Sequence, residues 1–323
     1  MKRAARGRRY RGSVSHAAPS LVVSVPTEEL VTGLQPAPAG AEVLLWDMTA
    51  PAPREAIDLV VPPYMSMSVV LPRLADVRTR LVQSQSIGYE GIEDHLPPGH
   101  VFANASSVHE TSTAELALAL ALAAQRHLPT FVRAQDQARW ASEFSDSLAD
   151  RRVLLLGYGG VGKAVAARLA PFEVELTVIA HRARFEDGMR IHGIERLHEL
   201  LPQAEIVILT LPGGESTHHV IDDAALSLLP DGALIVNVGR GPLIDTDALV
   251  GHLERGRLRA ALDVTDPEPL PADHPLWHQS GALIVPHVGG ASSAMKPRTL
   301  RLIRTQIERM LAGEPPLNVV YES

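Results

Sequence analysis

Cysteine is absent from the 323-residue sequence. A chain without thiols forms neither disulfides nor thiolate metal sites, so nothing in it points to an oxidising compartment, and we expect a cytoplasmic protein. Long apolar runs are lacking as well. The most apolar run, Leu116 to Ala124, is far shorter than the ~20 residues that cross a bilayer, so we expect no membrane segment.

Acidic residues are lacking from the first twenty positions, which carry a run of basic residues between Lys2 and Arg11. The whole chain has a formal net charge of −7, so this arm differs in sign from the rest. Short charged termini are usually solvated, and we predict a disordered arm over residues 1–20 that takes no part in the fold. The arm alone is too little to predict binding to nucleic acid.

The remaining sequence alternates short apolar runs with helical or turn segments in two series, which start at Leu21 and Val153. The 46% hydrophobic content is enough for two cores. Strands that alternate with helices form parallel sheets covered on both faces. We therefore predict an α/β protein with two Rossmann-like, doubly wound parallel-sheet domains. Residues 21–105 and 290–323 would form a flavodoxin-like domain, and residues 106–289 the other.

The predicted strands of the first series are Leu21–Pro26, Glu42–Trp46, Ile57–Val61, Thr79–Gln83 and Val101–Ala103. Those of the second are Val153–Leu156, Glu175–Ile179, Ile206–Leu211, Leu234–Val238, Ala260–Asp263 and Leu283–Val285. A very apolar helix joins the series, and we predict that Ser112 caps it with Glu115 in a capping box. We expect the apolar tail after Leu311 to return to the first domain.

A glycine-rich turn follows the strand that begins the second series. Its residues are Gly157, Tyr158, Gly159, Gly160, Val161 and Gly162. The spacing G-x-G-x-x-G lies directly after a strand and at the start of a helix, where Gly157 permits a tight turn and Gly159 lets the backbone approach a pyrophosphate. Gly162 allows close packing of the helix, whose N-terminus favours anions. The motif in this context predicts that residues 106–289 bind a dinucleotide.

The end of the next strand lacks an acidic residue. NAD enzymes usually carry Asp or Glu there for the ribose 2′-hydroxyl, whereas this chain has His181, Arg182 and Arg184. Because arginine pairs bidentately with a phosphate, we predict NADP in preference to NAD, with NAD as the second candidate. The alternative interpretation of these cations is an ordinary solvated basic turn.

Three later motifs carry Arg240, Glu268 and His287 in a fixed order. They are Val236–Pro242, Ala261–Pro271 and Val285–Gly290. With these flanks the order resembles the D-2-hydroxyacid dehydrogenase family, from about residue 80 to the C-terminus. The resemblance implies a nicotinamide-dependent oxidoreductase that forms a homodimer through its cofactor domains, with the first domain holding the substrate. It implies no metal.

The resemblance also implies roles that fit the chemistry. Hydride transfer to a 2-oxo acid leaves an alkoxide that needs a proton, beside a carboxylate that needs a cation. His287 would be the acid in reduction and the base in oxidation, and Glu268 would fix its tautomer and favour its protonated form. Arg240 would bind the carboxylate and polarise the keto oxygen. Asp263 would accept a hydrogen bond from the nicotinamide carboxamide.

Other residues match family segments more loosely. Ser86, Ile87 and Gly88 would form the loop that faces the substrate carboxylate, and the bulky Ile87, which stands where the family usually has a small residue, would narrow the pocket. The remaining expected cofactor contacts are Leu211, Pro212, Thr217, Val238, Gly239 and Gly289.

The main hypothesis is an NADP-preferring reductase of a small 2-oxo acid, because the run from Asp263 to Pro271 is most similar to glyoxylate and hydroxypyruvate reductases. Phosphite or formate oxidation is an alternative, although formate dehydrogenases of similar sequence carry Gln where Glu268 stands. Another alternative is a dinucleotide-sensing protein that binds partner proteins, because transcriptional co-repressors share this fold. The direction of the reaction and the substrate side chain stay open.

Overall fold

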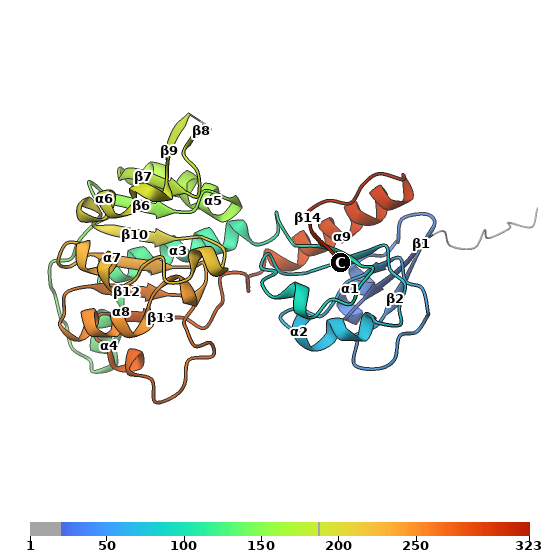
Figure 1. The fold of residues 1–323 in the computed structure, drawn as a ribbon. Coiled ribbons are helices and arrows are strands. Elements are labelled where there is room, and N and C mark those ends of the chain that lie inside the picture. Colours follow the sequence, from blue (N-terminus) through green and yellow to red (C-terminus); the bar gives the residue numbers. More distant parts are fainter. Residues whose placement is uncertain (1–20, 187) are drawn as a thin grey trace, which may run out of the picture. The chain divides into compact units, whose positions relative to one another are not determined.

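The computed structural model describes residues 21–186 and 188–323, so the basic arm predicted for residues 1–20 lies outside the described part. The described chain forms two compact units, each built around its own sheet (Figure 1). Both sheets are dominated by parallel strands, and this confirms the predicted fold class. Within the described ranges, no helix combines the length and the apolar character that crossing a bilayer requires.

Unit 1 contains the described residues up to Gln83, together with His95–Ala103 and Ile303–Ser323. Its strands are β1 (Leu21–Val25), β2 (Ala41–Leu45), β3 (Leu59–Val60), β4 (Leu81–Gln83), β5 (Val101–Ala103) and β14 (Val319–Glu322). Their order is β14-β5-β4-β3-β1-β2, in which only the pair of β14 and β5 is antiparallel. The five parallel strands follow the order 2-1-3-4-5 that is typical of flavodoxin-like sheets.

Helices cover this sheet, and the last strand of the chain, β14, forms one of its edges. The helices are α1 (Glu28–Gly33), α2 (Met67–Val70) and the second half of α9 (Met295–Leu311). Thr27 caps α1 by accepting a hydrogen bond from the amide of Leu30 at 3.3 Å. The fully buried Gln306 of α9 donates to Gln83 Oε1 at 2.7 Å and to the Leu317 carbonyl at 2.9 Å. These bonds hold the tail that leads into β14, so the predicted return of the tail to this unit is confirmed.

Unit 2 contains Ser84–Asp94 and Asn104–Leu302. Its strands are β6 (Arg152–Leu156), β7 (Glu175–Ala180), β8 (Arg184–Glu186), β9 (Met189–Gly193), β10 (Ile206–Leu209), β11 (Leu234–Asn237), β12 (Arg259–Leu262) and β13 (Ala282–Ile284). The order is β13-β12-β11-β10-β6-β7-β9-β8. Counted from β6 and without the edge strand β8, this is the Rossmann order 3-2-1-4-5-6 with a seventh strand beyond the sixth. The sequence prediction missed the antiparallel hairpin of β8 and β9, which supplies the third strand.

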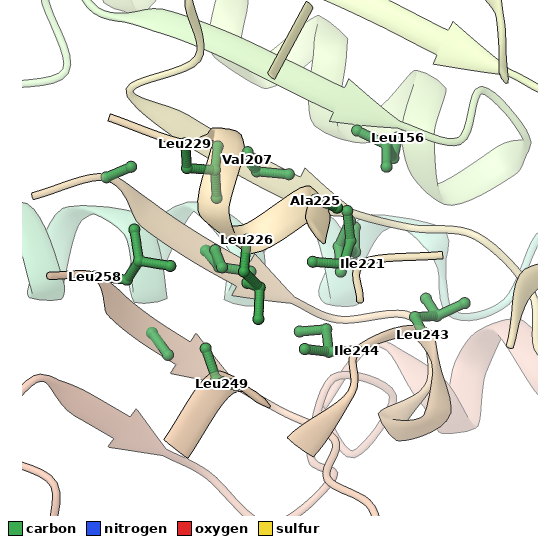
Figure 2. Packing of buried hydrophobic residues seen from close by; sticks show 14 of the residues in the cluster. Leu156, Val207, Ile221, Ala225, Leu226, Leu229, Leu243, Ile244, Leu249 and Leu258 are labelled. Carbon is green, nitrogen blue, oxygen red and sulfur yellow. The ribbon is translucent and has the colours of Figure 1, made fainter. Parts of the chain in front are cut away.

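Helices cover both faces of the sheet of unit 2. The helices of this unit are α3 (Glu110–Gln125), α4 (Leu128–Asp136), α5 (Gly160–Leu169), α6 (Leu197–Leu200), α7 (Asp223–Leu228), α8 (Thr246–Glu254) and the first half of α9. Of these, α4 contacts α3. Because successive side chains of a strand point to opposite faces, Val207 and Leu209 of β10 pack in a cluster with α6, α7 and α8. Figure 2 shows Val207 in this cluster together with Leu226 of α7 and Leu249 of α8. Ile206 and Ile208 pack in a second cluster with α3 and α5. Burial on both faces explains why this strand is a continuous apolar run.

The helix predicted from Ser112 starts earlier than expected. The first residue of α3 is Glu110, its N-cap is His109, and no side chain caps it. The predicted capping box is therefore wrong, because Ser112 lies inside the first turn and donates to the His109 carbonyl at 3.1 Å. The sequence prediction also missed α4. His127 adopts a left-handed conformation with φ of +52° that separates α3 from α4, and Pro129 fits the first turn of the new helix.

Candidate active site

The glycine-rich turn has the geometry of an anion cradle. Gly157 follows β6 with φ of +107°, a conformation that favours glycine. A Cβ at Gly162 would lie 2.1 Å from the Gly157 carbonyl oxygen, so α5 approaches the turn as closely as only glycine allows. No heavy atom of the described residues would lie within 4 Å of a Cβ at Gly159. Tyr158, Gly160 and Val161 complete the turn. The open space at the start of α5 fits the pyrophosphate of a dinucleotide.

The predicted cations lie beside this turn. His181 and Arg182 follow β7 and are exposed, and Arg184 begins β8. Arg184 Nη2 donates to the carbonyl of Tyr158 at 3.3 Å, which connects the hairpin to the glycine-rich turn. The sequence analysis missed Glu186 in this group.

Glu186 neutralises part of the cationic edge. Its carboxylate accepts from Lys163 Nζ at 2.6 Å and from Arg184 Nε at 2.7 Å. Hydrogen bonds from Lys163 and Arg184 lower the pKa of Glu186 below its ordinary value. Arg184, which the sequence predicts to bind a ribose 2′-phosphate, is therefore already paired with an internal carboxylate.

The structure brings His287 and Glu268 into direct contact. His287 Nδ1 lies 2.5 Å from Glu268 Oε1. The hydrogen bond that His287 donates to Glu268 and the charges of Glu268 and Asp263 raise the pKa of His287, although burial and Arg240 act to lower it. Burial acts to raise the pKa of Glu268, but the hydrogen bond and the charge of His287 lower it. The pair therefore favours a protonated imidazole beside an ionised carboxylate.

Asp263 holds the turn that presents His287. His287 has φ of +50°, and its amide donates to the Asp263 carbonyl at 2.8 Å. The Asp263 carboxylate is buried and accepts from the amides of Val288 at 2.6 Å and Gly289 at 3.0 Å. Burial raises the pKa of Asp263, while these two amides act to lower it. The left-handed conformation of a histidine is unusual, and these hydrogen bonds stabilise it.

Arg240 lies on a turn that a buried asparagine organises. Asn237, at the end of β11, donates from Nδ2 to the Arg240 carbonyl at 2.8 Å and accepts from the Gly239 amide at 3.0 Å. Val238 between them is buried. Arg240 Nη1 donates to the Gly239 carbonyl at 2.7 Å. The charge of Arg240 lowers the pKa of both His287 and Glu268, so the cation stands within electrostatic range of the pair.

The loop predicted to face the substrate belongs to unit 2 and reaches Arg240. Ser86 accepts from the Ala105 amide at 2.8 Å, and the Ile87 carbonyl accepts from Asn104 Nδ2 at 2.9 Å. A Cβ at Gly88 would lie 1.9 Å from Arg240 Nη2, so only glycine fits there without displacing the guanidinium group.

Other residues around Arg240 come from the turn after β10. Leu211 is buried, and Thr217 Oγ1 donates to the Pro212 carbonyl at 2.8 Å. Glu90 bridges this turn and Arg240, and the sequence analysis missed it although it stands only two residues after Gly88. Within the described ranges, no group of three or more His, Asp or Glu side chains could hold a metal ion.

The sequence matches a known family over half of its length. The family model described as "D-isomer specific 2-hydroxyacid dehydrogenase, NAD binding domain" matches residues 118–289. An uncharacterized protein of Corynebacterium melassecola is 33% identical over 219 residues, which cover 66% of this chain and 72% of that protein. Glyoxylate/hydroxypyruvate reductase B of Pectobacterium atrosepticum is 30% identical over 227 residues, 67% of this chain and 70% of that enzyme.

A solved structure shares the fold of both units. The D-isomer specific 2-hydroxyacid dehydrogenase from Xanthobacter autotrophicus Py2, in complex with NADPH and MES, is 28% identical with a TM-score of 0.78. The similarity covers 94% of this chain and 98% of that one. The match therefore extends well beyond the residues that the family model covers.

Proposed function

Since the chain belongs to the D-isomer specific 2-hydroxyacid dehydrogenases, oxidoreductases that act on 2-hydroxy acids with NAD(P), we propose that it reduces a small 2-oxo acid with NADPH. The observation that carries the proposal is the contact of 2.5 Å between His287 Nδ1 and Glu268 Oε1, within electrostatic range of Arg240. This arrangement provides a proton donor, His287, near a cation, Arg240, that can bind the carboxylate of a substrate. The relatives named glyoxylate or hydroxypyruvate reductases support a small substrate.

His287 and Arg240 have distinct roles in the proposed reduction. Because Nδ1 of His287 is held by Glu268, Nε2 is the nitrogen that gives its proton to the keto oxygen. The glycine-rich turn would hold the reduced nicotinamide dinucleotide whose hydride goes to C2, so the carbonyl would gain one hydride and one proton and become a hydroxyl group. Arg240 binds the substrate carboxylate and draws charge toward the keto oxygen. In the oxidation, neutral His287 takes the hydroxyl proton.

Asp263 acts on both the acid and the cofactor in this proposal. Its carboxylate already accepts from the amides of Val288 and Gly289, and so it positions His287. A carboxylate has about four acceptor sites, which leaves capacity for the nicotinamide carboxamide. Gly289 packs directly against this carboxylate, because a Cβ there would lie 2.8 Å from Asp263 Oδ2.

The preference for NADP depends on Arg184 and its neighbours. A 2′-phosphate would compete with Glu186 for Arg184 and Lys163, and its greater charge favours the exchange. Arg182, two residues before Arg184, adds an exposed positive charge, and the exposed His181 precedes it. The NADPH bound to the Xanthobacter autotrophicus enzyme supports this choice.

The test follows NADPH and NADH oxidation by absorbance with glyoxylate, hydroxypyruvate, pyruvate and phenylpyruvate. We expect faster turnover with NADPH, and a loss of about 100- to 10,000-fold in His287→Gln with NADPH still bound, as shown by its fluorescence. Arg184→Ser should raise KM for NADPH by about tenfold and leave KM for NADH unchanged. Full activity of His287→Gln would refute the role of His287 as the acid. A wild type that binds dinucleotide but oxidises it with none of the four acids would refute the proposed reduction of 2-oxo acids.

We also propose that the protein is a homodimer through unit 2. Trp140 and Phe144, in the segment after α4, are 97% and 105% exposed. Leu128 and Val132 of α4 are exposed beside them in sequence. Several large apolar side chains left exposed within one stretch of the sequence support a protein interface there, and a symmetric pair is the commonest assembly.

A further inference from the structure

Glu90 connects three segments of unit 2 around the proposed carboxylate-binding cation. Glu90 Oε1 lies 3.2 Å from Arg240 Nε, and Oε2 accepts from Arg240 Nη2 at 3.3 Å. Oε1 also accepts from the Gly213 amide at 3.2 Å. The carboxylate therefore covers the edge of the guanidinium group that Nε and Nη2 form.

Arg240 still has N–H donors for a substrate when Glu90 is bound to it. A guanidinium group has five N–H donors. Glu90 covers one on Nε and one on Nη2, and the Gly239 carbonyl takes one on Nη1. One donor on each of Nη1 and Nη2 is left for a substrate carboxylate, but the positive charge behind them is shared with Glu90.

The charge of Glu90 is present at neutral pH. Burial acts to raise the pKa of Glu90, but the charge of Arg240 and hydrogen bonds from the Glu90 amide, Arg240 and Gly213 lower it below its ordinary value. The site near Arg240 thus contains a fixed carboxylate that any incoming anion must meet.

A cavity of about 610 Å³ lies next to this pair. Its walls include Glu90, Arg240, Glu215, His218 and Pro242, together with Gly213 and Gly214. The two glycines add no side chains, and a Cβ at Gly213 would lie 3.2 Å from Arg240 Cγ. Two carboxylates and one already paired guanidinium make this wall a poor environment for a second negative charge.

We propose that Glu90 makes the site select monocarboxylic over dicarboxylic 2-oxo acids. The inference rests on the proposed reduction of 2-oxo acids. The substrate carboxylate takes the two remaining donors of Arg240, and its side chain extends into the cavity toward Glu90 and Glu215. An uncharged side chain fits that space, whereas a second carboxylate meets two like charges, a juxtaposition that suppresses the wrong partner.

The test compares 2-oxopentanoate with 2-oxoglutarate, which share a five-carbon chain and differ in the terminal carboxylate. The quantity measured is the ratio of their kcat/KM values with NADPH. We expect the wild type to favour 2-oxopentanoate, and Glu90→Gln to lower the ratio by about tenfold through faster use of 2-oxoglutarate. Glu93→Gln is the matched control, because Glu93 is an exposed carboxylate in the same loop. Its ratio should equal that of the wild type.

A second variant keeps the inference testable if Glu90→Gln does not fold. Glu215 is exposed, so Glu215→Gln should fold normally and lower the ratio in the same direction by a smaller factor. Glu90→Asp, which keeps the charge, should retain the selectivity. If Glu90→Gln lowers kcat/KM equally for both substrates, Glu90 only stabilises the structure around Arg240, and the inference is overturned. A wild type that reduces neither this pair nor any acid of the first panel would overturn the proposed function, and this inference with it.

Discussion

Glu268→Gln isolates the charge of Glu268 from its shape. The amide of glutamine has almost the same size as the carboxylate, and its oxygen can still accept from Nδ1 of His287. The orientation of the imidazole ring should therefore persist. What disappears is the negative charge 2.5 Å from the ring, which together with the hydrogen bond raises the pKa of His287 above its ordinary value of 6.5. The variant thus lowers that pKa.

The size of the effect follows from the contact and its exposure. The side chains of Glu268 and His287 are 37% and 29% exposed, so solvent screens the pair. The variant keeps the hydrogen bond and loses only the charge, and solvent screens that charge, so the loss lies below the range of about 1.5–3 kcal/mol of a charge-assisted hydrogen bond, at about 1 kcal/mol. Because about 1.4 kcal/mol corresponds to a factor of ten, the protonated fraction of His287 at alkaline pH should fall by about fivefold.

The assay is kcat/KM for reduction between about pH 5 and about pH 9. Reduction needs protonated His287, so the variant should match the wild type at the acidic end, where both imidazoles carry the proton. At the alkaline end kcat/KM should fall by about fivefold. Glu254→Gln, an exposed carboxylate on α8, is the control and should follow the wild-type profile. A loss of equal size at every pH would refute the reasoning, because it would show that Glu268 acts only through structure.

Two further predictions concern the cofactor and the assembly. Gly162→Ala should weaken NADPH binding at least about tenfold in a fluorescence titration, because its Cβ would lie 2.1 Å from the Gly157 carbonyl oxygen and displace the turn. Gly251→Ala, whose Cβ would meet only Arg255 Nη1 at 3.4 Å, should bind as the wild type does, and equal binding by both variants would contradict the close packing. Replacing Trp140 and Phe144 together by Asp should give a folded monomer in sedimentation, and an unchanged dimer would place the interface elsewhere.

Local patterns in the sequence were enough to predict the α/β architecture. The apolar run of β10 is buried on both faces, and such runs need no knowledge of distant residues to be recognised. The glycine-rich turn is equally local, because Gly157 and Gly162 lie within one turn and the helix that follows it. The hairpin of β8 and β9 was missed because β8 has only three residues, two of them exposed, and neither strand has a clear apolar period.

The sequence by itself determined the fold class, the family and the order of Arg240, Glu268 and His287, since these depend on short motifs and their flanks. Only the tertiary structure decided which charges meet. Glu90 is 150 residues from Arg240 in the chain, and their contact exists because the loop after β4 reaches the turn after β11. The pairing of Glu186 with Lys163 likewise requires the hairpin to fold beside α5. Charge pairs between distant segments depend on packing and leave no periodic signal in the sequence.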